Sequence, residues 1–187
     1  MQKYKSGFIG AAHFSDIIRM NLIAKHGGLW LDATIFCNGY IPDEYFNLSF
    51  FSCKSPYKEC GYVSAYRWTS FVLGGKKDSI FYRFMTDFYN EYWKKENCAI
   101  DYLFMDYTIV LAMKHIPCIS QAIQAVPINN LQRDDYAAIM NEEFDNDKLT
   151  KLLSGNTYLF KLSWREAYYE RTPERKETFY GKFISEN

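Results

Sequence analysis

Two pairs of side chains near the start of the chain have types and spacings that suit chemistry on a phosphorylated ligand. Asp16 and Arg19 are three residues apart, so a helix would present both on one face. Asp32 follows the apolar run 29–31, and Thr34 lies two residues further on. Carboxylate and hydroxyl oxygens are the ligands that magnesium or manganese prefers when it shares a site with a diphosphate.

The stretch 15–35 must position these groups, and its pattern predicts a helix, a glycine turn and a buried strand. Ser15 is expected to be the N-cap, with an acid in the first turn, where it meets the positive end of the helix dipole. Gly27 and Gly28 are expected to end the helix. The apolar run that follows predicts a strand buried on both faces, which leaves Asp32 at the strand end where open α/β sheets bind ligands.

Residues 13–36 resemble the core motif of the capsular polysaccharide synthesis proteins, within the DXD-type glycosyltransferases that use sugar nucleotides. The pattern is Ser-Asp, two apolar residues, Arg, an apolar helix, Gly-Gly, an aromatic between two apolar residues, and Asp-x-Asp. Every part is present except the last acid, where Thr34 stands. The capsular subgroup itself resembles this Asp-Ala-Thr variant.

The resemblance implies a GT-A-like, Rossmann-type α/β sheet with flanking helices, in one glycosyltransferase domain over residues 1–187. It implies a manganese or magnesium ion held by Asp32 and Thr34 on the diphosphate of a nucleotide-sugar donor. In this fold the nucleotide-binding strands lie upstream of the Ser-Asp helix, where this chain has only residues 1–14. We therefore expect either an N-terminally truncated domain or strands supplied by another segment.

The resemblance also implies roles for the helix side chains in substrate binding and catalysis. Arg19 would contact the sugar or a phosphate through its forked donors, and Asp16 would accept hydrogen bonds from sugar hydroxyls. Trp30 would either pack beside the sugar or fill the core. Taken alone, the spacing of the acid and the arginine also fits a capping acid with a salt bridge to the next turn.

Two further helices are predicted at 79–95 and 101–115, separated from the preceding segment by a glycine-rich turn at 74–77. Asp106 lies among apolar neighbours, so it must find a partner or shift its pKa. The capsular family resembles this stretch too, which implies a catalytic or substrate-binding role for Asp106 and a substrate-binding role for Asp101. Asp101 is also expected to be the N-cap of its helix.

The C-terminal half predicts a strand at 157–162, followed by Ser163 and Trp164. This segment resembles the element of the wider group that closes over the donor diphosphate. A hydroxyl there can complete a cation shell and an indole N–H can bond a phosphate oxygen, although a strand end with a packing tryptophan fits as well. Residues 48–53 predict another strand, whereas 119–150 show little pattern beyond short helices in their polar part.

Composition excludes several classes of protein. The chain has 22 basic and 22 acidic residues, which argues against electrostatically driven binding of nucleic acid. Five cysteines without a close pair indicate a reducing compartment, and no apolar run is long enough to span a bilayer. We expect a cytoplasmic protein, either soluble or peripherally attached to the inner face of the membrane. Aromatic residues make up 19% of the chain, which fits an aromatic core or a saccharide groove.

These observations, with the resemblance, predict a hexosyltransferase-like enzyme of capsular polysaccharide synthesis. Its partners would be a nucleotide-sugar donor and a saccharide or lipid-linked glycan acceptor. The resemblance implies that the donor's anomeric configuration is retained. Two alternatives remain open: a non-catalytic glycan-binding module or degenerate fragment, and a metal-dependent hydrolase that uses water as its acceptor.

Overall fold

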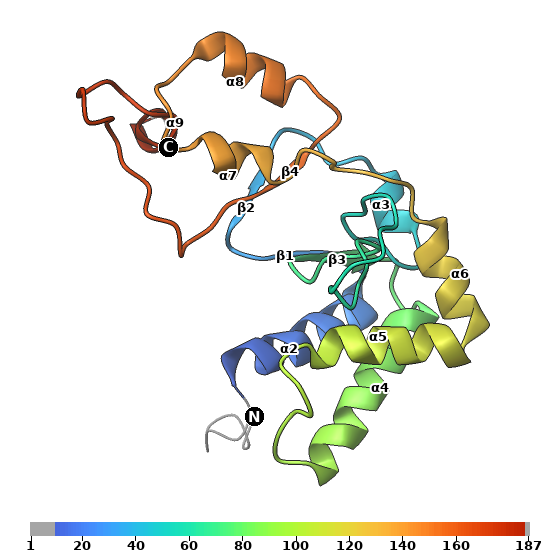
Figure 1. Cartoon of the computed structure of the whole chain (residues 1–187). Helices are drawn as coiled ribbons and strands as arrows, with labels where there is room; N and C mark the ends of the chain where they lie inside the picture. Colours follow the sequence, from blue (N-terminus) through green and yellow to red (C-terminus); the bar gives the residue numbers. More distant parts are fainter. Residues whose placement is uncertain (1–9, 186–187) are drawn as a thin grey trace. The chain divides into compact units, whose positions relative to one another are not determined.

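The computed structural model describes residues 10–185, which hold eight helices and two small antiparallel sheets (Figure 1). The chain divides into two compact units, Met1–Leu31 with Pro42–Ile128, and Asp32–Ile41 with Asn129–Asn187. The α/β class is confirmed. Both sheets of the described residues are two-stranded, and a larger Rossmann-type sheet stays a prediction. Residues 1–9, on which the expected truncation bears, lie outside the described residues.

In the first unit, β1 (Gly28–Leu31) pairs with the fully buried β3 (Val72–Gly75). Strand β1 is half-buried along its length, so the expected burial on both faces is wrong. Gly74 has no room for a side chain, because Leu29 and the Gly28 carbonyl lie against its Cα. Gly74 and Gly75, which were predicted to form a turn, are the last two residues of strand β3.

The segment predicted as a strand at 48–53 is irregular and meets β3 through a single bridge. Phe51 donates to the Gly74 carbonyl at 2.6 Å and accepts from its N–H at 2.9 Å. The apolar content of the segment reflects burial, since Phe50, Phe51 and Cys53 are fully buried. The short helix α3 (Glu44–Asn47) precedes it and packs on β3.

Helix α2 (Ala11–His26) begins five residues earlier than predicted, with Gly10 in extended conformation at its N-cap. The expectation that Ser15 is the N-cap and Asp16 lies in the first turn is wrong, because Gly10 already provides the change of backbone direction. The helix ends as predicted: Gly27 has φ 71° and its N–H donates to the Ile23 carbonyl at 2.8 Å. A Cβ on Gly27 would lie 2.7 Å from the backbone nitrogen of Lys77.

Helices α4 (Ile80–Lys95) and α5 (Phe104–His115) confirm the two predicted helices, and both pack on α2. Ser79 is the N-cap residue of α4. Pro117 follows the end of α5, and it also begins α6 (Pro117–Ala125), which the sequence did not predict. Proline suits the first helical position because its missing N–H would have no partner there.

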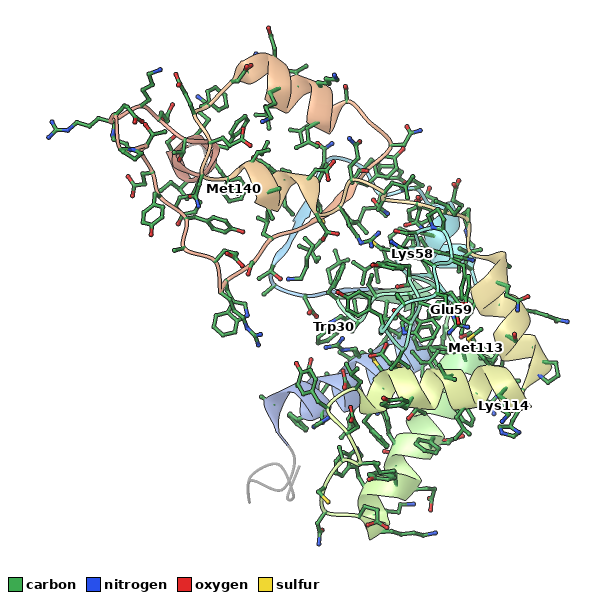
Figure 2. The ribbon with its side chains drawn as sticks, viewed as in Figure 1. Trp30, Lys58, Glu59, Met113, Lys114 and Met140 are labelled. Atoms are coloured by element: carbon green, nitrogen blue, oxygen red, sulfur yellow. The ribbon has the colours of Figure 1, made fainter. Side chains whose placement is uncertain are left out.

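In the second unit, β2 (Ile35–Cys37) pairs with β4 (Leu159–Lys161), which confirms the strand predicted at 157–162 with shorter bounds. Three helices complete the unit: α7 (Asp135–Ile139), α8 (Asn146–Leu153) and α9 (Phe179–Ser185). Its core contains Met140, labelled in Figure 2, together with other side chains: Tyr136, Ile139, Leu152, Phe160 and Phe179.

The described residues also show the state of the cysteines and the character of the helices. The five cysteines carry free thiols. Between residues 10 and 185, none of the helices combines the length and the apolar composition that crossing a membrane requires.

Candidate functional site

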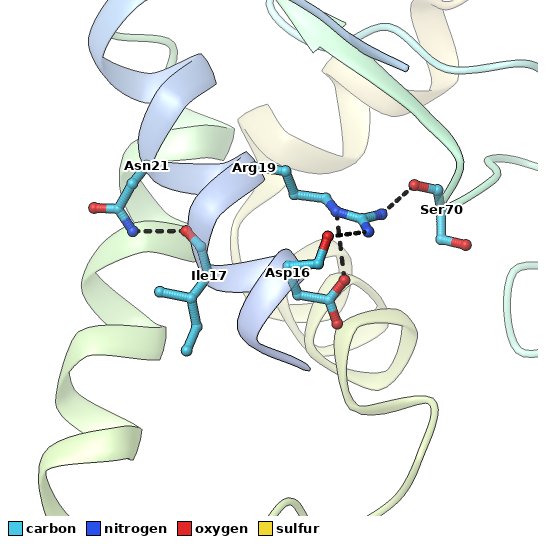
Figure 3. Close-up of polar contacts among 6 residues, drawn as sticks. Asp16, Ile17, Arg19, Asn21 and Ser70 are labelled. Atoms are coloured by element: carbon cyan, nitrogen blue, oxygen red, sulfur yellow. Dashed lines mark hydrogen bonds and ion pairs between the residues drawn. The ribbon is translucent and has the colours of Figure 1, made fainter. Parts of the chain in front are cut away.

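Asp16 and Arg19 form an ion pair on one face of α2 (Figure 3). The distance from Arg19 Nε to Asp16 Oδ1 is 3.5 Å, and the side chains are only 7% and 14% exposed for the arginine and the acid. The shared face expected from their spacing is confirmed. Because the pair is largely buried, its geometry is held more firmly than that of a surface salt bridge.

The guanidinium of Arg19 is fixed by further contacts within the first unit. It donates to the Ser70 carbonyl, as Figure 3 shows, and at 3.0 Å to Ser15 Oγ. Its Cζ lies 5.2 Å from the ring centroid of Trp30, which Figure 2 labels. Trp30 therefore contacts the arginine from β1, and the arginine holds Asp16 in place.

Asp106 approaches the same region from α5. Its Oδ1 accepts a hydrogen bond of 2.6 Å from Trp68 Nε1, and burial raises the pKa of its carboxyl group despite that bond. The expectation that this acid must find a partner or shift its pKa is confirmed, since it does both. A carboxylate whose solvation is incomplete gains from a ligand that donates hydrogen bonds to it.

Tyr89 of α4 connects these charges. Burial raises its pKa well above the ordinary value; Asp16 adds to the rise, Arg19 opposes it and Asp106 adds to it. The three charged groups are therefore close enough to act on one phenol. We call Asp16, Arg19, Tyr89 and Asp106 the helix cluster. The Tyr89 hydroxyl is buried and has no hydrogen-bond partner among the described residues.

Sequence reasoning did not single out Tyr89 or Trp68 for this cluster. Tyr89 lies four residues after Met85 and four before Trp93, so it belongs to the buried stripe of α4. A tyrosine within such a stripe brings a hydroxyl that needs a partner, and that was the available signal. Trp68 lies outside any helix or strand, and no sequence pattern ties it to Asp106.

Asp101 has a different environment from the helix cluster. It is exposed, and its Oδ1 accepts from the Leu103 N–H at 2.7 Å, just before α5 begins. This contact gives it a helix-capping role, although the N-cap residue itself is Leu103. It also lines an apolar groove with Ile100 and Tyr107. A substrate-binding role for Asp101 stays a prediction.

The predicted metal ligands lie in the second unit. Asp32 directly follows β1, as expected, and Thr34 directly precedes β2. The Thr34 hydroxyl accepts a hydrogen bond from Lys161 Nζ, which also donates to the Leu162 carbonyl at 2.7 Å. Burial lowers the pKa of the Lys161 ammonium, while Asp32 and Asp134 act in the opposite direction. We call Asp32, Thr34 and Lys161 the lysine turn.

These residues do not fit a divalent-cation site by themselves. Between residues 10 and 185, no group of three or more His, Cys, Asp or Glu side chains is arranged to hold a metal ion. The hydroxyl of Thr34 is already bonded to an ammonium, which would repel a second cation. A manganese or magnesium ion on Asp32 and Thr34 stays a prediction that would require Lys161 to move.

Ser163 and Trp164 lie beside the lysine turn in the chain. Ser163 Oγ accepts from the backbone N–H of Arg165 at 3.1 Å, so its hydroxyl stabilises a turn. Trp164 is 77% exposed, and the Cζ of Arg165 lies 5.2 Å from its ring centroid. Both residues line a groove of about 450 Å³ that also includes Thr34. The alternative of a packing tryptophan is therefore wrong, whereas donor binding stays a prediction.

The structure thus brings the predicted site residues together in two groups, one in each unit. Asp16, Arg19 and Asp106 gather in the helix cluster of a mixed α/β protein, beside Trp30. Residues 1–183 match the family model of the capsular polysaccharide synthesis proteins, and the chain belongs to this family. No curated protein and no solved structure matches it.

Proposed function

We propose that the protein is a glycosyltransferase of capsular polysaccharide synthesis. It would move a sugar from a nucleotide-sugar donor to a saccharide or lipid-linked glycan acceptor. Membership of the capsular family supports the pathway, and the chemistry of the helix cluster supports the reaction. Placement within the DXD-type, GT-A group belongs to this proposal and rests on the motif at residues 13–36.

The observation that carries the proposal is the convergence of two largely buried carboxylates and one guanidinium around Tyr89. Sugars present several hydroxyl donors in a fixed geometry, and carboxylates are strong acceptors for them. Asp16 is held by Arg19 and Asp106 by Trp68, so both acceptors have defined orientations before a ligand arrives. Prior orientation lowers the entropic cost of placing the reacting carbon.

Each residue then has a distinct task. Asp16 and Asp106 accept hydrogen bonds from the donor sugar, and Arg19 orients Asp16 and adds a positive charge near the diphosphate. An acceptor hydroxyl oxygen forms a bond to the anomeric carbon while the bond to the diphosphate breaks. The electron pair of that bond leaves with the diphosphate, and a diphosphate oxygen takes the proton of the acceptor hydroxyl. We propose that the donor's anomeric configuration is retained, which proton NMR of the product measures directly.

The test incubates the full chain with UDP-, GDP- and dTDP-sugars and a panel of oligosaccharide acceptors, with and without manganese. Release of the nucleoside diphosphate and appearance of an extended glycan are measured together. We expect Asp106→Asn to lower turnover at least about a hundredfold, because it removes a charged acceptor from an oriented site. Asp87→Asn, on the exposed face of α4, is the matched control and is expected to keep full turnover.

Other outcomes would assign the chain differently. Thermal stabilisation by saccharide alone, with no response to any nucleotide sugar, would identify a glycan-binding module. Release of the diphosphate at a rate independent of added glycan would identify a hydrolase. Failure of every donor to bind a folded protein would overturn the proposal.

A further inference from the structure

Two adjoining grooves of the second unit combine aromatic rings with polar side chains. The first groove, of about 450 Å³, is lined by Ser163, Glu166 and four aromatic rings: Trp164, Tyr168, Tyr180 and Phe183. The second groove, of about 580 Å³, shares part of this lining: Leu162, Ser163, Glu166 and Tyr168. Every residue that lines either groove belongs to the second unit. We call the two together the aromatic groove, and each has the volume of a small-molecule site.

The indole of Trp164 is the most accessible of the rings that line this groove. Trp164 is 77% exposed, whereas Tyr168, Tyr180 and Phe183 are half-buried. A sugar ring presents C–H groups on its face and hydroxyl groups at its edge. A flat aromatic ring with hydrogen-bonding groups beside it matches both parts of such a ligand.

The polar lining favours a neutral ligand that donates hydrogen bonds. Glu166 lines both parts of the groove, and its exposed carboxylate is a strong acceptor for hydroxyl groups. Within residues 10–185, the first part of the groove has no lysine or arginine in its lining, so a phosphate would find no positive charge there. In the second part, Lys161 is accompanied by the acidic Asp134 and Glu166.

The segment that carries Trp164 and Glu166 is held in place by hydrogen bonds within the second unit. The side-chain amide of Asn141 donates to the Ala167 carbonyl and accepts from the Tyr169 N–H, both at 2.9 Å. The Tyr168 hydroxyl accepts from the Ser163 N–H at 3.3 Å. These contacts fix the shape of the groove before a ligand arrives, which lowers the entropic cost of binding.

We propose that the aromatic groove binds a saccharide chain of at least two sugar residues. Trp164 lies against the face of one sugar ring, and Glu166 accepts hydrogen bonds from hydroxyl groups of the chain. The second part of the groove holds the neighbouring sugar. The inference goes beyond the proposed function, because it concerns the second unit alone and holds whether or not the helix cluster transfers a sugar.

Isothermal titration of the full chain, in EDTA and without nucleotide, tests this proposal. The probes are maltohexaose, cellohexaose, N-acetylchitohexaose and a set of purified bacterial capsular polysaccharides, and we expect at least one to bind. Trp164→Ala should weaken that binding at least about tenfold, whereas Trp164→Phe keeps a ring and should stay within a few-fold. Tyr57→Ala removes a ring that is 67% exposed in the first unit, and this control should not change binding.

The acidic side chain gives an independent test. Glu166→Gln should weaken binding of the same probe about three- to tenfold, because it replaces a charged acceptor with a neutral one. Glu174→Gln, at an exposed position of the same unit, is the matched control and should not change it. The monosaccharide of the probe should bind more weakly than the chain.

Several outcomes would overturn the proposal. They are failure of every saccharide probe to bind, unchanged binding in Trp164→Ala or Glu166→Gln, and equal affinity for the monosaccharide and the chain. Titration with UDP, GDP and dTDP adds another: if Trp164→Ala weakened nucleotide binding and left saccharide binding intact, Trp164 would serve the donor. Transfer of a sugar is measured separately and decides the proposed function, so the two can fail independently.

Discussion

The indole nitrogen of Trp68 donates to Oδ1 of Asp106 across 2.6 Å, and it joins a loop of the first unit to helix α5. Trp68 is fully buried, at 1% exposure, so the donor has little freedom to move away from the carboxylate. The backbone N–H of Asp106 also interacts with its own carboxylate. A carboxylate fixed in this way is well suited to orient a ligand that donates hydrogen bonds to it.

Replacing Asp106 with asparagine should change the free energy of unfolding in a way that depends on pH. Burial raises the pKa of Asp106, so the native state binds more protons than the unfolded chain between the ordinary and the raised value. The free energy of unfolding contributed by this group therefore falls as the pH rises through that window. Asp106→Asn removes the effect, and its stability relative to the unaltered chain should increase as the pH rises from the ordinary carboxyl pKa through the raised one.

Urea unfolding at several pH values, followed by tryptophan fluorescence, measures this difference. Asp87→Asn controls for the loss of one negative charge from an exposed position on α4. A stability difference that is constant with pH would show that burial does not disfavour the Asp106 carboxylate.

A lysine cannot replace Arg19 at the centre of its contacts. The guanidinium reaches the Ser70 carbonyl, Ser15 and Asp16 and lies over Trp30, and a single ammonium cannot make these contacts from one position. We expect Arg19→Lys to lose about 1–3 kcal/mol of unfolding free energy. Chemical denaturation checks the loss. Arg83→Lys, exposed on α4, should change stability by less than about 0.5 kcal/mol, and a similar loss in both variants would contradict the argument.

Sequence reasoning located the elements with strong local signals. The amphipathic stripe of α4 and the glycine at the end of α2 are local features, and both were predicted correctly. The acid and arginine of α2 share a face because of helical periodicity alone. The start of α2 was predicted wrongly at Ser15. Serine is a common N-cap residue but also occurs inside helices, and the sequence alone does not distinguish the two positions.

Long-range pairings explain most of what sequence reasoning missed. The buried segment around Phe51 looks like a strand because it is apolar, yet its pairing with β3 is limited to one bridge. The contact of Trp68 with Asp106 spans 38 residues, and that of Lys161 with Thr34 spans 127. No local sequence pattern predicts a contact between residues so far apart in the chain. Lys161 in particular gave no signal as a partner of the predicted metal ligands.

Lys54 should stabilise the end of α6 from a distant part of the chain. Its Nζ donates to the carbonyls of Ile123 at 3.2 Å, Gln124 at 2.9 Å and Val126 at 2.8 Å. Carbonyls at a helix end lack partners within the helix, and a cation there also opposes the helix dipole. Lys54→Met should therefore cost about 1–2 kcal/mol of unfolding free energy.

Hydrogen exchange should locate the effect of Lys54→Met in the last turn of α6. Lys58→Met, at an exposed position of the neighbouring loop, serves as the control and should leave that turn protected. Unchanged exchange in α6 after Lys54→Met would mean that water replaces the ammonium without loss.

A methyl group at Gly74 should strain a position of β3 that pairs both with β1 and with Phe51. A Cβ there would lie 2.1 Å from Leu29 Cδ2 and 2.8 Å from the Gly28 carbonyl oxygen. The leucine can rotate, but the carbonyl belongs to the paired backbone and cannot move without disturbing the strand. We expect Gly74→Ala to lose about 1–3 kcal/mol, the usual range for overpacking a buried site.

Gly61→Ala is the matched control for this prediction, because a Cβ at Gly61 would meet nothing within 4 Å. It should change the free energy of unfolding by less than about 0.5 kcal/mol. Thermal and urea unfolding of both variants measure the difference. If Gly74→Ala were as stable as Gly61→Ala, the close approach of the strands would not constrain this position. The packing around β3 would then not require a glycine at position 74.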